Sequence, residues 1–301
     1  DGHEVFIGGI MQHIEEAGVH SGDSSCVIPP YEVSDAVKKE IETITAKLAL
    51  ELKVVGLINL QFAVKDDKVY VLEVNPRSSR TVPFVSKYTN VPLANIAAQI
   101  SVGKSLNEFK LQKNNFEHYA VKKAVLPFKK FKDEKVFLGP EMKSTGEVMG
   151  IDMSTGSAFL KAMKSDGYNV PKQGTAFLSV NKADREGLVP IAKSLMGLGF
   201  SLVATKGTCK FLNEHGIICD EMFKVGEGRP NVVDEILNDN IQLVINTPEG
   251  PQSRFDEEAI GKTSVMKNIL TITTLPGARA AIDSMKHLNK ISVKALQEYF
   301  K

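Results

Sequence analysis

The chain has 301 residues, 43% of them hydrophobic, and its 37 lysines and arginines nearly balance its 36 aspartates and glutamates. This length suits two domains, each with its own core. A formal net charge of +1 gives no long-range field that would attract nucleic acid or an acidic membrane. We therefore expect a globular protein that binds neither, and no apolar run reaches transmembrane length.

The three cysteines, Cys26, Cys209 and Cys219, are odd in number and show no CxxC spacing. This pattern argues against a disulfide framework and a zinc site, and it favours a reducing compartment. The sequence has no secretion signal at its start, so the expected location is the cytoplasm. Because the chain opens on Asp1 without a methionine, we expect a piece of a longer polypeptide.

The first part of the chain mixes strand and helix signals. Residues 4–25 are strand-like and end in a loop rich in Gly, Ser and Asp. Residues 34–52 open with a capping Ser34 and repeat apolar residues at helical spacing, so they predict a helix. A second helix is expected over 91–106, closed by Gly103. Residues 107–166 indicate an irregular connector that contains one strand-like run, 120–128.

From about residue 167 the pattern becomes a regular alternation. Apolar strands are expected at 176–180, 201–205, 222–225, 242–247 and 269–274, with helical stretches such as 182–199 between them. Such alternation predicts an α/β fold with a mostly parallel sheet covered on both faces. Ligands of such sheets bind beyond the carboxyl ends of the strands.

Two apolar runs, 54–64 and 68–75, predict a hairpin joined by a polar tip. Glu73 and Asn75 lie two apart on the second strand, so their side chains share one face. If the turn is centred on Asp67, Gln61 lies opposite Glu73 on that face. A turn centred one half-step earlier would place the two on opposite faces.

A carboxylate with two amide oxygens suits a hard cation such as Mg²⁺, which keeps several waters and binds nucleotide phosphates. Arg77 and Arg80 follow directly and carry forked donors suited to a phosphoryl group. The alternative is an ordinary strand end in which these polar side chains cap a turn and Arg77 pairs with Glu73.

A loop at residues 17–25 offers His20, Ser21 and backbone amides beside Gly18 and Gly22, enough to contact ribose or phosphate. A plain turn explains the same residues equally well.

The second half holds a candidate phosphate cradle at residues 205–208, where a strand meets a helix. Exposed amides at a helix start, two hydroxyls, a lysine and a glycine suit a phosphate group. Further polar residues follow other strand ends of the same sheet: Ser179, Lys182, Arg185, Lys224, Asn246 and Thr247. Because no nucleophile and base accompany them, the pattern favours binding over catalysis.

Eight motifs appear in order along the chain: AGVHSGDS, NLQFAV, EVNPRSSRTVPFVSK, VPLANIAA, LGPEMKSTGEVMG, ATKGT, EGRPNV and VINTPEG. Together they closely resemble the C-terminal part of the large subunit of carbamoyl-phosphate synthetase, from residue 1 to the end. The resemblance implies a partial ATP-grasp α+β lobe, 1–166, which phosphorylates carbamate with ATP. It also implies a methylglyoxal-synthase-like allosteric domain with a parallel sheet, 167–301.

The family's properties follow by resemblance. They imply ATP with Mg²⁺ or Mn²⁺, a glutamine amidotransferase small subunit as partner, an oligomer, and a place in pyrimidine and arginine biosynthesis. By position, the nucleotide contacts are Gly18, Val19, His20, Ser21, Gln61 and Glu73, the metal ligands are Gln61, Glu73 and Asn75, and Arg77 is the catalytic residue. The pocket for the effectors UMP or IMP is Ser179, Arg185, Thr205, Thr208, Lys224 and Asn246. Glu15, Asp23 and Thr273 fall where bacterial members bind the activator ornithine.

Two positions depart from the family pattern. Pro248 stands where a threonine helps to hold the effector phosphate, and Lys123 stands where a glutamate contacts ornithine, so that a diamine would be repelled. Two other functions remain open. The chain could act only as a regulatory binding module, or as a methylglyoxal synthase, for which the loops lack a carboxylate base.

Overall fold

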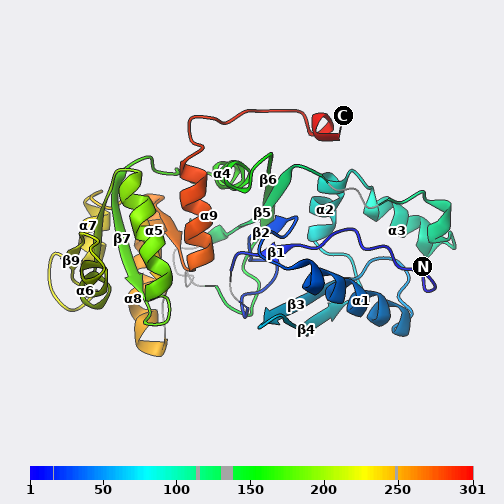
Figure 1. Ribbon diagram of the computed structural model, residues 1–301, viewed down its shortest axis with the longest axis horizontal. Coiled ribbons are helices and arrows are strands. Elements are labelled where there is room, and N and C mark those ends of the chain that lie inside the picture. The colour runs from blue at the N-terminus through cyan, green and yellow to red at the C-terminus, as the bar shows by residue number, and fades with distance from the viewer. Residues whose placement is uncertain (16, 113–115, 130–137, 248–249, 301) are drawn as a thin grey trace. The chain divides into compact units, whose positions relative to one another are not determined.

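The protein is described here by a computed structural model that covers residues 1–15, 17–112, 116–129, 138–247 and 250–300 (Figure 1). Contacts divide the chain into two compact units. The first comprises residues 1–13, 26–122 and 292–301, and the second comprises 14–25 and 123–291. The two domains expected from the resemblance, 1–166 and 167–301, stay a prediction. Within the described ranges, no helix is long and apolar enough to cross a membrane.

The start of the chain departs from the strand expected over residues 4–25. In the described part of that range the only named strand is β1 (Gln12–His13), and β2 (Cys26–Ile28) follows it. They pair antiparallel, and β2 pairs on its other side with β5 (Tyr119–Val125). The strand prediction was wrong for residues 4–11, which lack the backbone partner that a strand requires.

The predicted hairpin of the first unit is confirmed. Strands β3 (Asn59–Lys65) and β4 (Lys68–Asn75) form a two-stranded antiparallel sheet. Asp66 and Asp67 make the turn, with φ of 51° and 56°. Both residues therefore adopt the left-handed conformation that the favoured two-residue hairpin turn requires, and aspartate tolerates it.

The helices of the first unit are α1 (Asp35–Glu51), α2 (Thr81–Thr89) and α3 (Leu93–Ser101). The hydroxyl of Ser34 accepts a hydrogen bond from the Val37 amide at 3.3 Å, so the predicted cap of α1 is confirmed. Gly103 follows α3 with φ of 101°, as expected of a residue just beyond a helix end. Helix α2 was missed because Pro83 lies in its first turn, where proline is tolerated. Short 3₁₀ turns lie at Leu106–Glu108 and Leu296–Phe300.

The second unit holds the predicted parallel sheet. Its strands are β7 (Gly174–Val180), β8 (Phe200–Thr205), β9 (Asp220–Met222), β10 (Leu243–Thr247) and β11 (Leu270–Ile272). Their order is β11-β10-β7-β8-β9, and each neighbouring pair is parallel. The α/β class and the parallel sheet are thus confirmed, although β9 begins two residues earlier than expected.

Helices connect and cover these strands: α5 (Arg185–Gly197), α6 (Lys206–Glu214), α7 (Val232–Leu237), α8 (Gly250–Lys267) and α9 (Leu275–Met285). Helix α5 packs against β7, β8 and α9, and α7 packs against α8 (Figure 1). A buried cluster joins Phe177 and Val244 of the sheet to Val232, Ile236 and Ile260 of α7 and α8. This apolar core packs α7 and α8 against β7 and β10.

In the region expected to be an irregular connector, the one strand predicted there, over 120–128, is confirmed as β5. The region also contains a second strand and a helix, so the prediction that the rest is irregular was wrong. Strand β6 (Gly146–Asp152) neighbours β5, and helix α4 (Thr155–Ser165) packs against β6 and α9. Gly150 allows the contact of β6 with α4. A Cβ at this position would overlap the Ala158 carbonyl oxygen and lie 2.6 Å from the Ala162 nitrogen.

Replacing Gly150 with Ala is therefore expected to lower the free energy of unfolding by roughly 3 kcal/mol, since backbone atoms cannot yield to the new methyl group. Gly146, on the same strand, is the control, because a Cβ there meets no atom within 4 Å. Urea unfolding of both variants measures the difference. Equal stabilities of Gly150→Ala and Gly146→Ala would contradict the tight contact.

Candidate functional site

The hairpin of the first unit brings the predicted metal-binding side chains together. Gln61 is the direct cross-strand partner of Glu73, and Asn59 is the partner of Asn75. Direct partners in an antiparallel pair project from the same face of the sheet. Of the two arrangements that the sequence left open, the structure therefore shows Gln61 and Glu73 on the same face. Gln61 and Asn75 are half-buried, whereas Glu73 is exposed.

A β-bulge produces this juxtaposition. The turn pairs Lys65 with Lys68, so its centre lies one half-step before Asp67. With a regular ladder, that centre would place Gln61 and Glu73 on opposite faces. The register shifts between Gln61 and Phe62, because Phe62 pairs with Val71 and Gln61 pairs with Glu73. Leu72 is the extra residue that restores the shared face.

Asn59 is a fourth member of this polar face, and the sequence analysis missed it. Its side chain shares the face of Gln61 because the two residues are two apart on β3. Its amide nitrogen lies 3.5 Å from the Thr81 hydroxyl and donates a weak hydrogen bond to it. Asn59 and Gln61 are two residues apart, as are Glu73 and Asn75, so the same spacing could have identified Asn59 from the sequence.

The donor set fits a partly hydrated hard cation. It offers one carboxylate and three amide groups, and oxygen donors of this kind suit Mg²⁺ or Mn²⁺. Among the described residues, Glu73 forms no ion pair, and Arg77 instead donates from Nη1 to the Ser78 carbonyl at 3.1 Å. The structure therefore lacks the Arg77–Glu73 pair of the alternative interpretation. No group of three or more His, Cys, Asp or Glu residues suited to a metal occurs in the described part of the chain.

The loop with Gly18, Val19, His20 and Ser21 belongs to the second unit, whereas the hairpin belongs to the first. Gly18 has φ of 110°. The Nδ1 atom of His20 accepts a hydrogen bond from the Gly22 amide at 3.0 Å, and the His20 amide donates to the Gly139 carbonyl at 2.8 Å. His20 therefore stabilises a turn and holds the loop against a distant segment.

The carboxyl end of the parallel sheet gathers the residues predicted for the effector pocket. Ser179 and Asn246 are direct partners on β7 and β10. The hydroxyl of Thr208 accepts from the Val180 amide at 3.3 Å and lies 3.4 Å from the Thr205 hydroxyl. Thr205, Thr208 and Asn246 are buried.

Arg185 adds a guanidinium group to this end of the sheet. A Cβ on Gly207 would lie 2.7 Å from Arg185 Nη2, so the guanidinium lies against the first turn of α6. The Nε atom of Arg185 is buried and has no hydrogen-bond partner within the described ranges. Lys224 lies two residues beyond the end of β9, which pairs with Thr205 through Met222. Pro248, expected to depart from the family pattern, lies outside the described residues.

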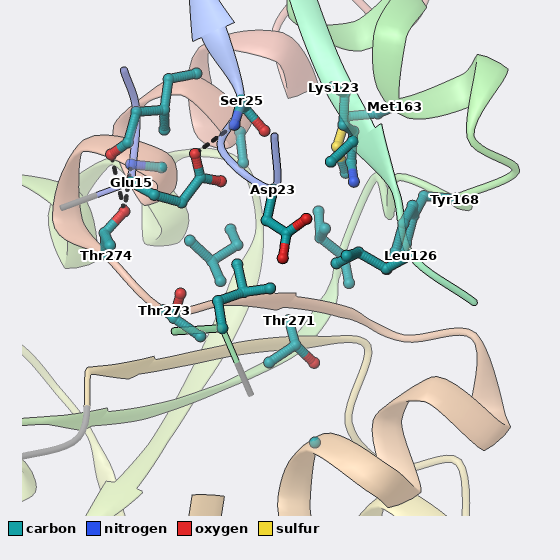
Figure 2. Close-up of a pocket in the computed structure, with 18 of the residues that line it drawn as sticks. Glu15, Asp23, Ser25, Lys123, Leu126, Met163, Tyr168, Thr271, Thr273 and Thr274 are labelled. Atoms are coloured by element: carbon teal, nitrogen blue, oxygen red, sulfur yellow. Dashed lines mark hydrogen bonds between the residues drawn. The ribbon is translucent and has the colours of Figure 1, made fainter. Parts of the chain in front are cut away.

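A cavity of about 140 Å³ in the second unit brings together Glu15, Asp23 and Thr273 (Figure 2), and Asn246 also lines it. Glu15 accepts a hydrogen bond from the Ser25 amide at 2.5 Å, and burial raises the pKa of its carboxyl group. The carboxylate of Asp23 accepts hydrogen bonds from the Lys143 amide at 2.7 Å and the Ser144 amide at 2.8 Å. Both acids are thus held rigidly at the cavity wall.

Comparisons with known proteins give matches to the part of the chain that contains the hairpin and to the part that contains most of the parallel sheet. Residues 5–109 match the model of the carbamoyl-phosphate synthase L chain ATP binding domain, and residues 187–273 match that of the MGS-like domain. The carbamoyl phosphate synthase large chain of Acidobacterium capsulatum is 52% identical over 99% of this chain, and that of Archaeoglobus fulgidus is 51% identical over 99%. Over 99% of its length, this chain is thus similar to carbamoyl phosphate synthase large chains. The predicted resemblance is therefore confirmed.

This chain spans 28% of the length of each of those two carbamoyl phosphate synthase large chains. A third relative, from Aquifex aeolicus, is named the C-terminal section of the large chain. It is 47% identical over 100% of this chain, which covers 60% of it. The biotin carboxylase domain of a single-chain bacterial carboxylase superposes with a TM-score of 0.38 and 17% identity, over 46% of this chain and 39% of that one. This likeness is too low to support an inference.

The matched regions contain most of the candidate residues. The hairpin with Gln61, Glu73 and Asn75 lies within the ATP binding domain match, as do Glu15 and Asp23. Thr205, Thr208, Lys224 and Asn246 lie within the MGS-like match, which ends at Thr273. The two family models therefore cover the hairpin in the first unit and most of the parallel sheet in the second.

Proposed function

We propose that this chain is part of a carbamoyl phosphate synthase, a ligase that forms carbamoyl phosphate from bicarbonate, an ammonia source and two ATP. In this proposal the hairpin of the first unit acts in the phosphorylation of carbamate. The observation that carries the proposal is the cross-strand pairing of Gln61 with Glu73, inside the segment that matches an ATP binding domain.

At this step an oxygen of carbamate attacks the γ-phosphorus of ATP, and the bond from that phosphorus to the bridging oxygen breaks to release ADP. The side-chain oxygens of Gln61, Glu73 and Asn75 would hold Mg²⁺ or Mn²⁺, which when bound neutralises phosphate charge. Arg77 is exposed directly after β4, and its forked donors can offset charge on the transferring group. The loop from Gly18 to Ser21 would contact the nucleotide.

The parallel sheet of the second unit would bind a nucleotide monophosphate effector, UMP or IMP. Three observations support this role: the buried hydroxyls of Thr205 and Thr208, the start of α6, and the Nε atom of Arg185, which has no hydrogen-bond partner among the described residues. A helix start and a guanidinium group together favour a phosphate. Ser179, Lys224 and Asn246 would complete the contacts with the effector.

The partners and setting belong to the same proposal. A glutamine amidotransferase small subunit would deliver ammonia, and the enzyme would be an oligomer in the cytoplasm, acting in pyrimidine and arginine biosynthesis. The similarity to a protein named the large chain supports a small-subunit partner, since that name implies a second, smaller subunit. The cysteine pattern supports the location.

The proposal is tested with a complete large chain that carries this sequence, supplied with bicarbonate, ammonia and Mg-ATP. We expect carbamoyl phosphate to form with two ADP released per product. The partial reverse reaction, synthesis of ATP from carbamoyl phosphate and ADP, isolates the step assigned here. Absence of both reactions from a folded large chain would refute the assignment.

The second candidate is a regulatory module without catalysis, favoured by the effector residues at the carboxyl end of the sheet. Calorimetry on the 301-residue chain separates the two functions. We expect UMP or IMP to bind and Mg-ATP to give no measurable heat, because the chain spans only 28% of the length of the large chains that it matches. Tight binding of Mg-ATP would show that the chain alone forms a complete ATP site.

A further inference from the structure

One motif of the chain, LGPEMKSTGEVMG at residues 138–150, has no part in the function proposed above. Its first half contacts the loop at residues 17–25, to which nucleotide binding is assigned, and both segments belong to the second unit. The His20 amide donates to the Gly139 carbonyl at 2.8 Å. We call residues 139–144 the anchoring segment, because further hydrogen bonds join it to the same loop.

Ser144 makes the strongest of these connections. Its hydroxyl donates to the Gly22 carbonyl at 3.0 Å, and its amide donates to Asp23 Oδ1 at 2.8 Å. The Lys143 amide donates to the other carboxylate oxygen of Asp23 at 2.7 Å. Asp23 is 2% exposed and Ser144 is 5% exposed. Hydrogen bonds to a buried carboxylate are strong, and a buried partner left without its bond is costly, so the two segments hold each other firmly.

The contacts fix the base of the loop and leave its tip accessible. Asp23 and Ser24 are buried, whereas Gly18 is exposed. Between them, the His20 carbonyl accepts hydrogen bonds from the Asp23 amide at 2.9 Å and the Ser24 hydroxyl at 3.3 Å. The Nδ1 atom of His20 accepts from the Gly22 amide at 3.0 Å. A loop that is rigid at its base and open at its tip suits contact with a ligand.

Met142 of the anchoring segment also packs closely on the loop. A Cβ on Gly22 would lie 2.9 Å from Met142 Sδ and 3.1 Å from His20 Nδ1. The absence of a side chain on Gly22 therefore permits both the approach of the anchoring segment and the turn at His20.

We propose that Ser144 is a positioning residue for the nucleotide. Through Gly22 and Asp23 it holds residues 18–21 in the conformation that contacts the nucleotide. Because a loop that is already ordered loses little conformational entropy on binding, the anchoring segment would strengthen nucleotide binding without touching the ligand. This inference rests on the nucleotide-binding role proposed for the loop.

Replacing Ser144 with Ala in a complete large chain is expected to raise the KM for ADP about 3- to 10-fold in ATP synthesis from carbamoyl phosphate, with kcat little changed. The nucleotide would then have to order the loop, which weakens binding of the substrate and of the transition state equally. Ser144→Thr keeps the hydroxyl and should retain the KM of the unaltered chain. A serine needed only for folding would lower the melting temperature without changing this KM.

Hydrogen exchange of the amides of residues 18–22 gives a second measurement that does not depend on activity. We expect faster exchange in Ser144→Ala than in the unaltered chain, because the loop opens more often when its anchor is weakened. A large chain that makes no ATP in the reverse reaction would contradict the proposed function, whereas exchange would still test the role of Ser144 in ordering the loop.

Ser284→Ala is the matched control. Ser284 is fully buried in α9 of the same unit, and its hydroxyl also donates to a backbone carbonyl, that of Ala281, at 2.6 Å. We expect this variant to change neither the KM for ADP nor the exchange of residues 18–22. An unchanged KM or unchanged exchange in Ser144→Ala would overturn the inference, as would equal changes in Ser284→Ala.

Discussion

Replacing Glu73 with Gln in a complete large chain is expected to slow carbamate phosphorylation by about 10²- to 10³-fold, the usual cost of losing one electrostatic contributor to a transition state. Glu73 supplies the one carboxylate of the polar face that it shares with Gln61, Asn59 and Asn75. Glutamine keeps the size and the oxygen but loses the negative charge, so the hairpin should persist while its attraction for a divalent cation falls.

The measurement is ATP synthesis from carbamoyl phosphate and ADP, with binding of UMP or IMP as the check on folding. Asp66→Asn is the control, because it removes the same charge from the tip of the same hairpin, and asparagine tolerates its φ of 51°. We expect the control to retain activity and both variants to bind the effector. Full ATP synthesis by Glu73→Gln would contradict the assignment of Glu73 as a metal ligand.

The hairpin shows how far the sequence alone could define this site. Alternation of apolar residues and the polar tip predict both strands, and spacing by two places Glu73 beside Asn75. Whether Gln61 joins them depends on one residue of register. The bulge at Leu72 decides this, and it has no sequence signal such as a glycine, so only the structure could supply it.

Strand β5 shows a different limit of sequence analysis. Lysine is seldom buried, yet Lys122 on this strand is fully buried and Lys123 lines a cavity. The partner of Lys123 is Asp166, which lies at the end of α4, a helix that the sequence analysis did not predict. The burial of both lysines depends on contacts between segments that are far apart in the sequence. Neither the hydrophobic pattern of a strand nor its β-propensity predicts such contacts.

The grouping of the candidate effector residues was predicted in outline because parallel strands present their carboxyl ends at one edge. The register confirms that Ser179 lies beside Asn246, and the hydrogen bonds join Thr205 to Thr208. The position of Arg185 against Gly207 could not be predicted, since it depends on how α5 and α6 pack. In the described part of the chain its buried Nε atom has no hydrogen-bond partner, so we expect its replacement to weaken binding of a phosphate more than the replacement of an exposed arginine.

Replacing Arg185 with Gln is expected to weaken UMP or IMP binding by roughly 10- to 100-fold, the range for losing a hydrogen bond to a charged group. Lys193→Gln is the control, because Lys193 is exposed on the same helix. Calorimetry measures affinity, and thermal unfolding without effector distinguishes the roles. A structural arginine would lower the melting temperature when replaced. A phosphate-binding arginine leaves a buried donor unsatisfied until the effector arrives, so its loss should leave the free protein equally stable; a lower melting temperature with unchanged affinity would contradict this role.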